Sequence, residues 1–282
     1  MRELEAALDQ DRSAQSGATG LHGTYVGGNR MLISTTWGGR LLVPADDISL
    51  MPELVANGTY DAPFTAFVQR NIKPGDTVID VGAHVGLFTL LLAYSVWDTG
   101  RVIAYEPCPR MLELLRDNVG MGWLGDRVEI VAKAAAATSG SLSFLAPTRY
   151  TMTGSLRPVE HLLTTQDRVD TVDRIEVEAE PIDVHVGRFE QIDLIKIDVE
   201  GAENQVFTGM EQLLASGVVR RVSFELAREH MGDEWKPFTE RLRGLEADGW
   251  TFSTISDTGE PQPIALRTVF ERGRFSHVLM QR

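Results

Sequence analysis

A strand-like segment that runs into a glycine-rich turn is the feature of this sequence best suited to bind a ligand. Residues 78–86 have the sequence VIDVGAHVG, in which the apolar strand ends at Gly82. Glycine lets the backbone bend sharply there and lets a ligand approach closely, while Gly86 allows the next helix to start tight against the sheet. The next acidic residue at a strand end is Glu106, about 20 residues further on, where a carboxylate can accept both hydroxyls of a ribose. This spacing predicts a nucleotide site of the Rossmann type.

His84 discriminates among the ligands that such a turn can bind. It stands where a dinucleotide fingerprint has its middle glycine, whose role is to let the backbone approach a pyrophosphate. S-adenosylmethionine contains an adenosine but no phosphate, so a side chain is tolerable at this position. His84 therefore favours S-adenosylmethionine over NAD. The alternative is a glycine turn that binds no ligand. This alternative is less favoured, because Glu106 follows at the spacing expected of a ribose-binding carboxylate.

A second group of chemically useful side chains follows the strand predicted at residues 192–198. Asp198 ends this strand, at the edge where ligands of open α/β sheets bind. There it could hold the amino group of a methionine moiety, or serve as general base for a substrate hydroxyl. Glu200 and Glu203 follow at the start of the next helix, where acidic side chains interact favourably with the helix N-terminus. For Glu203 this structural explanation is preferred.

Further candidates surround Asp198. Lys196 shares its face of the strand and should be paired if buried, with Glu225 near the end of the next strand as the expected partner. Asp198 and Glu225 could instead share a magnesium ion, which would lower the pKa of a bound hydroxyl. The sequence has no neat ligand cluster, so metal dependence is the less favoured alternative. His230 and His161 are candidate bases, although each is more often an ordinary loop histidine.

Charge argues against a nucleic-acid partner. The chain has 282 residues, 43% of them hydrophobic and 24% charged, which is ordinary for a globular protein with a substantial core. Its net charge of −13 would repel a phosphate backbone, and no run of lysine and arginine offsets it. A small-molecule substrate is therefore expected.

Cysteine usage and hydropathy predict a cytoplasmic protein. The single cysteine, Cys108, cannot form an intramolecular disulfide, and it follows Pro107 in a loop expected to line the adenine pocket. The longest apolar stretch, residues 85–97, is much shorter than the ~20 residues needed to cross a bilayer. Residues 1–15 lack the apolar segment of a signal peptide. No membrane partner is expected.

The elements that would position these residues alternate between strands and helices from residue 77 onward. Short apolar runs joined by helices indicate parallel strands that are buried on both faces. The last two strands have no clear helix between them and are expected to pair antiparallel. Strands are predicted at 77–81, 101–105, 128–131, 192–198, 218–225, 250–255 and 277–281, and helices at 87–94, 111–118, 205–216 and 239–248.

Two regions lie outside this alternation. Residues 1–73 are predicted to form an N-terminal cap, with a short helix near Leu4, a hairpin around Gly38-Gly39 and a helix at 63–72. The hairpin could make a homodimer contact. Within the main domain, residues 74–282, the segment 133–191 has strand-like pieces at 141–145 and 175–179 but no convincing crossover helix. We interpret its polar part, 149–170, as a candidate substrate lid, and a surface insertion without function is the alternative.

Three segments of this chain resemble the FkbM family of methyltransferases. They are DVGAHVG at 80–86, Glu106-Pro107 with Leu115 and Asn118, and DLIKIDVEGAE at 193–203. The last is the most specific, since a match of that length rarely arises from general fold constraints. The resemblance covers residues 76–225 well and both ends weakly.

The resemblance implies an α/β, Rossmann-like class I methyltransferase fold, with a seven-stranded, mostly parallel sheet whose last strand is antiparallel. It also implies O-methylation of a sugar, a polyketide or a similar small molecule. The family often has asparagine where this chain has His84. From the residues and the resemblance together, we predict cofactor binding by Asp80, Gly82, His84, Gly86, Glu106, Pro107 and Asp198, and catalysis by Asp198, Glu225 and His230.

Two other functions remain as alternatives. An NAD-dependent oxidoreductase is disfavoured by His84 and by the lack of a second catalytic domain. A binding or scaffold protein could have kept the fold and lost the activity. The methyl acceptor, its receiving atom and the oligomeric state are not encoded in these motifs.

Overall fold

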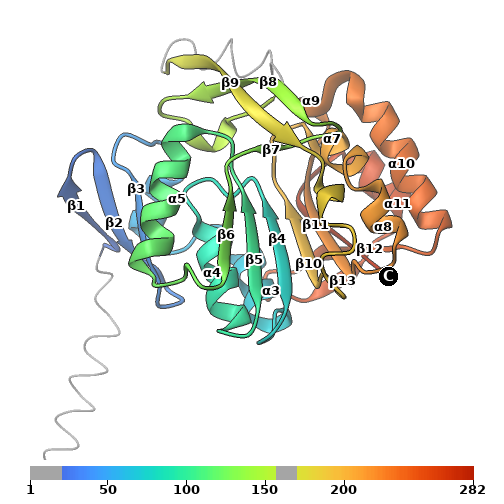
Figure 1. The fold of residues 1–282 in the computed structure, drawn as a ribbon, viewed down its shortest axis with the longest axis horizontal. Coiled ribbons are helices and arrows are strands. Elements are labelled where there is room, and N and C mark those ends of the chain that lie inside the picture. The colour runs from blue at the N-terminus through green and yellow to red at the C-terminus, as the bar shows by residue number, and fades with distance from the viewer. Residues whose placement is uncertain (1–20, 157–169) are drawn as a thin grey trace, which may run out of the picture.

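An eight-stranded sheet with helices on both faces forms the centre of the molecule (Figure 1). The computed structural model describes residues 21–156 and 170–282, so the helix expected near Leu4 and the candidate base His161 lie outside the described residues. The strand order across the sheet is β13-β12-β14-β11-β10-β4-β5-β6. The strands are β4 (Thr77–Val81), β5 (Arg101–Tyr105), β6 (Val128–Val131), β10 (Leu194–Ile197), β11 (Arg221–Ala227), β12 (Thr251–Ile255), β13 (Pro261–Pro263) and β14 (Arg274–Gln281).

One side of this sheet is parallel and the other is antiparallel. Strands β6, β5, β4, β10 and β11 run parallel, whereas β14 is inserted antiparallel between β11 and β12. The predicted α/β, Rossmann-like class I methyltransferase fold with a reversed last strand is confirmed. The predicted count of seven strands is one short, because β13 pairs with the outer edge of β12. This edge strand has two prolines in three residues and lacks the alternating apolar pattern of a strand.

Each face of the sheet carries its own hydrophobic core. Alternate strand residues point to opposite faces, so Val78 and Ile79 of β4 belong to different cores. The apolar stretch predicted to be buried forms α4, and no helix of the described ranges is long and apolar enough to cross a membrane. The first core holds α3 (Ala62–Asn71), α4 (Leu87–Val96) and α5 (Pro109–Met121), and the second holds α7 (Glu203–Thr208), α8 (Glu211–Ala215), α9 (Arg228–Met231), α10 (Trp235–Ala247) and α11 (Leu266–Arg272).

Two helices differ from expectation. The single helix predicted at 205–216 is divided into α7 and α8 at Gly209, where a Cβ would lie 2.0 Å from the carbonyl oxygen of Ala136. The backbone must pass close to its neighbour there, and only glycine permits this. The expected absence of a helix between the last two strands is wrong, because α11 lies there. Its seven residues are too few to display a helical period in sequence.

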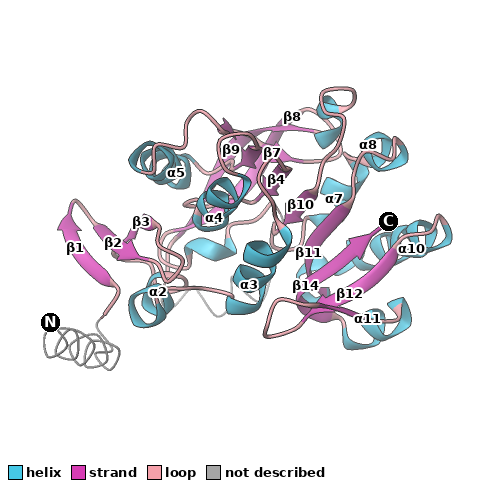
Figure 2. Cartoon of the chain, turned by 90° about the horizontal axis from the view of Figure 1, so that it is seen from below, coloured by secondary structure: helices cyan, strands magenta, loops and turns pink. Residues whose placement is uncertain are grey.

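The N-terminal segment contains more structure than predicted. The hairpin is confirmed as β2 (Arg30–Ser34) and β3 (Arg40–Pro44), and β1 (Gly23–Gly27) extends it to three strands. A further helix, α2 (Met51–Asn57), was also missed; it is short, and the Asp47 carboxylate accepts the N–H groups of its first turn. In both views the small sheet lies beside α5 (Figures 1 and 2).

The segment after β6 forms a second three-stranded sheet. Strands β7 (Ala134–Ala135), β8 (Gly140–Pro147) and β9 (Val172–Glu180) pair in the order β7-β9-β8, which confirms and lengthens the two predicted strand pieces. A 3-10 turn, η1 (Thr151–Thr153), follows β8, and another, η2 (Ile182–His185), follows β9. The lid function of this segment, and the division of the chain at residue 73, stay predictions.

Asn118, on α5, joins the N-terminal hairpin to the turn between β4 and α4, and its loss is expected to destabilise the protein. It is fully buried, its side-chain oxygen accepts from Leu42 N at 2.7 Å, and its amide donates to the carbonyls of Leu42 and Val85. Asn118→Leu should lower the free energy of unfolding by about 2–4 kcal/mol, because it leaves buried backbone groups unpaired. Urea denaturation measures this loss. The exposed neighbour Arg116 is the control, and a leucine variant as stable as Arg116→Ala would contradict the assignment.

Candidate active site

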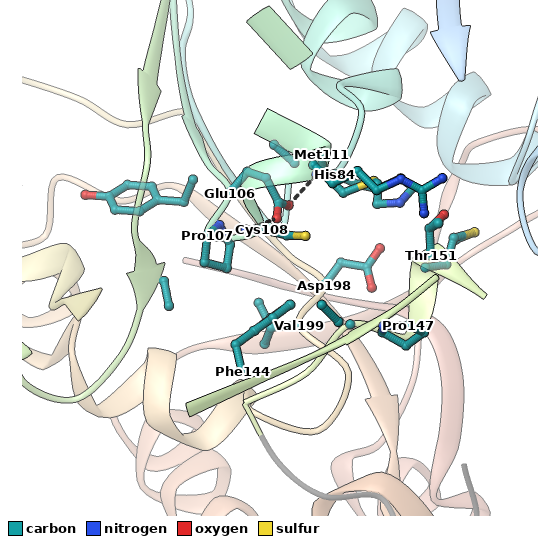
Figure 3. A pocket seen from close by; sticks show the side chains of 18 of the residues that line it. His84, Glu106, Pro107, Cys108, Met111, Phe144, Pro147, Thr151, Asp198 and Val199 are labelled. Atoms are coloured by element: carbon teal, nitrogen blue, oxygen red, sulfur yellow. Dashed lines mark hydrogen bonds between the residues drawn. The ribbon is translucent and has the colours of Figure 1, made fainter. Parts of the chain in front are cut away.

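A cavity of about 540 Å³ opens at the carboxyl ends of β4, β5 and β10 (Figure 3). The predicted residues Gly82, His84, Glu106, Pro107 and Asp198 line it. Its wall also includes two groups from outside the Rossmann-like core. These are Asn29, Asp46, Leu50 and Tyr60 from the N-terminal segment, and Phe144, Ala146, Pro147, Thr148, Thr151, Met152, Gly154, Leu156, Asp173 and Ile175 from the second sheet and its turn.

The glycine turn is fixed by contact with two neighbouring strands. Gly82 has φ +82°, and a Cβ there would lie 1.9 Å from the carbonyl oxygen of Asp198. Its N–H and that of Ala83 both donate to the carbonyl of Tyr105. Gly86, at φ +94°, begins α4, and a Cβ there would lie 2.6 Å from the Leu115 side chain. Glycine at these positions is therefore required by packing, and Gly86 lies outside the cavity lining.

Glu106 connects the turn to the loop after β5. Its side chain is 5% exposed, Oε2 accepts from His84 N at 2.7 Å, and Oε1 accepts from Cys108 N at 2.8 Å (Figure 3). Burial raises the pKa of Glu106 to about 7, although these two hydrogen bonds act in the opposite direction. Each carboxylate oxygen keeps a further lone pair, so the group can still accept hydrogen bonds from a ligand.

Lys196 forms a buried ion-pair triad with two aspartates. Its side chain is 2% exposed, and Nζ lies 3.3 Å from Asp198 Oδ2 and 3.4 Å from Asp80 Oδ1. The expected partner of Lys196, Glu225, is thus replaced by Asp80, which the β4–β10 register places directly opposite the lysine. Burial alone would raise the pKa of Asp198, but Lys196 and His277 bring it below its ordinary value. Asp198 is therefore a charged group at the cavity wall.

Asp80 was predicted to bind the cofactor, but the structure does not bring it to the cavity. It is fully buried, and Oδ2 accepts from Thr89 Oγ1 at 2.6 Å. Its other oxygen faces Lys196. Asp80 therefore affects the cavity indirectly: it holds Lys196, which in turn contacts Asp198 at the cavity wall.

Glu225 lies close to Asp198, as predicted, and Glu200 joins them. One oxygen atom from each of the three carboxylates lies within 4.8 Å of the other two. Burial, followed by the charges of Asp198 and Glu200, raises the pKa of Glu225 to about 10. His230 Nδ1 lies 3.2 Å from Glu200 Oε2, and this contact raises the pKa of His230. Within the described ranges, neither Glu225 nor His230 lines the cavity.

The His84 ring enters the cavity wall with one nitrogen unpaired. Nε2 is buried and has no hydrogen-bond partner in the part of the chain that the structure describes. Burial lowers the pKa of His84 to about 4, so the ring is neutral near pH 7. Its backbone has φ +53°, a conformation that histidine tolerates better than most residues.

Contacts between the N-terminal segment and the second sheet close one side of the cavity. Arg110, at the start of α5, donates to Asp46 Oδ1 at 2.6 Å and to the carbonyl oxygen of Thr148. Thr151 Oγ1 donates to Asp47 at 3.0 Å. Sequence reasoning missed these residues and Tyr60, because they lie in segments far apart in the sequence that only the fold brings together.

Two residues outside the predicted catalytic and cofactor-binding set, His277 and Cys108, also have defined surroundings. His277 lies between Asp61, at 2.9 Å, and Ser223, at 3.0 Å, and so holds the start of α3 against β14 and β11. Cys108 lines the cavity as expected, and burial raises the pKa of its thiol.

Comparison with known proteins places this geometry in a family. A profile described as the Methyltransferase FkbM domain matches residues 80–252, which is more than half of the chain. The match starts at Asp80, two residues before Gly82, and includes β10, β11 and the first two residues of β12.

Curated relatives carry methyltransferase names. The chain is 24% identical over 222 residues to methyltransferase sdnD of Sordaria araneosa, covering 70% of this chain and 82% of that protein. It is 30% identical over 161 residues to the 31-O-demethyl-FK506 methyltransferase FkbM of Streptomyces tacrolimicus, covering 50% of this chain and 61% of that protein. A match to the AMB antimetabolite synthetase AmbE of Pseudomonas aeruginosa spans 8% of that protein.

Solved structures of methyltransferases align at a lower level. An O-methyltransferase from Bacillus cereus in complex with SAH has a TM-score of 0.40 and 16% identity, covering 84% of this chain and 82% of that one. TomG from Streptomyces achromogenes, in complex with SAM, has a TM-score of 0.42 and 12% identity, covering 78% of each chain. The extent of the family match decides the assignment: this chain belongs to the FkbM family of methyltransferases.

Proposed function

We propose that this protein transfers a methyl group from S-adenosylmethionine to a hydroxyl of a small molecule, such as a sugar, a polyketide or another natural product. The observation that carries the proposal is that the glycine turn, Glu106 and Asp198 line one cavity at the carboxyl edge of the sheet. The family supports methyl transfer. Oxygen as the receiving atom is supported by the relative named 31-O-demethyl-FK506 methyltransferase.

The residues around the cavity fit an adenosine that carries no phosphates. Glu106 has free lone pairs for the two ribose hydroxyls. Gly82 lets the turn pack against the carbonyl oxygen of Asp198, and Pro107 and Cys108 offer an apolar wall for the adenine. A pyrophosphate fits poorly, because the His84 side chain occupies the turn and the carboxylates of Glu106 and Asp198 line the same cavity. When bound, S-adenosylmethionine supplies an activated methyl group.

The protein must then orient the acceptor and assist loss of its proton. Asp198 is the charged group at the cavity wall that best suits a catalytic role. Lys196 holds its side chain in place and favours its ionised form. It can accept a hydrogen bond from the cofactor amino group or from the acceptor hydroxyl. Tyr60 lines the same cavity, and burial followed by the charge of Asp198 raises the pKa of its phenol, which stays protonated and able to donate.

The apolar part of the wall suits exclusion of water from the reacting groups. Leu50 comes from the N-terminal segment, Phe88 from α4, and Met152 and Leu156 from the segment after β8. Exclusion of water from the cavity strengthens the electrostatic interactions of Asp198 and Glu106. An NAD-dependent oxidoreductase and a binding protein without activity are the alternatives, and the first experiment below separates them.

Cofactor choice can be measured by thermal shift. S-adenosylhomocysteine at 100 times its Kd should stabilise the protein by about 2.7 kcal/mol, and NAD at millimolar concentration should have no effect. Stabilisation by NAD alone would support the oxidoreductase, and stabilisation by neither would support the binding protein. Glu106→Ala should weaken S-adenosylhomocysteine binding, whereas Glu240→Gln, at an exposed site on α10, should leave it unchanged.

Cofactor affinity should rise with pH through the ionisation of Glu106. Its pKa of about 7 lies above the ordinary value of 4.5, so the free protein keeps this proton up to neutral pH. If the carboxylate accepts the ribose hydroxyls, affinity at pH 6 should be about tenfold below its value at pH 8. Calorimetry with S-adenosylhomocysteine measures this, and Glu106→Gln should bind more weakly with little pH dependence. Equal wild-type affinity at both pH values would contradict this role.

The same ionisation predicts a change in stability without ligand. Because the folded pKa is raised, the native state holds a proton that the unfolded chain releases, so stability is present at low pH and falls as pH rises from about 4.5 to 7. Glu106→Gln should reduce this slope.

Asp198→Asn should lower turnover far more than cofactor binding. Loss of a positioned base typically slows reaction by ~10²–10⁴-fold. The measurement is transfer of tritium from S-adenosyl-[methyl-³H]methionine to a panel of hydroxylated sugars and polyketides, with S-adenosylhomocysteine affinity measured in parallel. We expect affinity to change less than the rate. A variant that methylates at the wild-type rate would remove Asp198 from the mechanism.

A further inference from the structure

Three carboxylates meet where β10 and β11 end, next to the cavity. The oxygen atoms that Asp198, Glu200 and Glu225 offer lie within 4.8 Å of one another, and all three side chains are partly buried. Asp198 also lines the cavity, so the cluster and the cavity share one residue. Carboxylates at this separation repel one another strongly unless a cation or a proton lies between them.

Among the described residues, the cationic side chains near this cluster do not pair with all three of its carboxylates. Lys196 divides its charge between Asp198 and Asp80. His230 Nδ1 lies 3.2 Å from Glu200 Oε2, so it acts on Glu200 and leaves Glu225 without a cation. In the described ranges, Glu225 has no ion-pair partner. The cluster therefore includes a carboxylate, Glu225, with no cation beside it in the described ranges.

A fourth carboxylate beside the cluster has an unpaired buried oxygen. Glu203 is 1% exposed, and its Oε1 accepts from Gly201 N at 3.1 Å. Its Oε2 has no hydrogen-bond partner in the described part of the chain. The carboxylates that act on it electrostatically are those of Glu200 and Asp198, two members of the cluster. A buried carboxylate oxygen without a donor is unfavourable, so a donor is expected on that side.

We propose that Asp198, Glu200 and Glu225 bind one divalent cation of the kind that prefers oxygen ligands, Mg²⁺ or Mn²⁺. Three carboxylates without nitrogen or sulfur ligands select such ions, and the remaining coordination positions are filled by water or by substrate oxygens. A water molecule on the cation donates to Glu203 Oε2. His230 is a positioning residue, since its Nδ1 contacts Glu200 Oε2 at 3.2 Å.

This cation would determine which acceptors the cavity takes. This effect on acceptor choice rests on the proposed function. A cation beside Asp198 adjoins the cavity, so an acceptor oxygen can occupy one of its free positions. Acceptors with a second oxygen next to the reacting hydroxyl, such as vicinal diols and hydroxyketones, would bind by two oxygens and be preferred.

Binding of Mn²⁺ to the purified full chain tests the site directly. Electron paramagnetic resonance detects the loss of the free Mn²⁺ signal, and calorimetry with Mg²⁺ gives the stoichiometry. We expect one site with a Kd below about 1 mM, and at least tenfold weaker binding in Glu225→Gln and in Glu200→Gln. Glu240→Gln, which removes an exposed carboxylate on α10, should bind like wild type.

Measuring S-adenosylhomocysteine binding in the same samples separates the two proposals and verifies that the variants fold. No saturable Mn²⁺ binding, or equal binding by wild type and both cluster variants, overturns the metal site while cofactor binding still stands. Mn²⁺ binding that depends on Glu200 and Glu225, in a protein that does not bind S-adenosylhomocysteine, supports the metal site and overturns the methyltransferase proposal instead.

Discussion

A lysine charge buried between two aspartates is the interaction on which the site depends. Lys196 and Asp80 are register partners on adjacent parallel strands, so the ion pair forms only when β4 and β10 align correctly. Removing one partner of a buried pair leaves an uncompensated charge, which typically costs about 3–5 kcal/mol. The same lysine fixes Asp198 and favours its ionised form. One buried cation therefore links the register of the sheet to the charge at the cavity wall.

The ends of three strands are connected around this lysine. The carbonyl of Asp198 closes against Gly82, the carbonyl of Tyr105 accepts two N–H groups of the glycine turn, and Glu106 accepts the N–H of His84. A shift of β4 would break contacts with both neighbours, and a shift of β5 or β10 would break contacts with β4. This mutual dependence gives the cavity a fixed shape before any ligand arrives, which lowers the entropy lost on binding.

Sequence reasoning found the central sheet and most of the candidate site because those residues lie in regular, periodic segments. Gly82, Glu106 and Asp198 occupy strand ends, whose position in space follows from the fold class. Elements without a period were missed, including α11 and β13. The partner of Lys196 was misassigned because Asp80 and Glu225 both lie on neighbouring strands, and only the register distinguishes them. Arg110 meets Asp46, and Thr151 meets Asp47, through segments far apart in the sequence, and their spacing carries no information on these contacts.

Part of the cavity wall comes from residues that precede the family match in the sequence. Asn29, Asp46, Leu50 and Tyr60 line the cavity, yet the family match begins at residue 80. Proteins that agree closely from residue 80 onward can therefore differ in the shape and polarity of this wall. Under the proposed function, the choice of acceptor can diverge through residues 29–60 while the residues that bind the cofactor stay the same, so exchanging that segment between relatives is a route to new specificity.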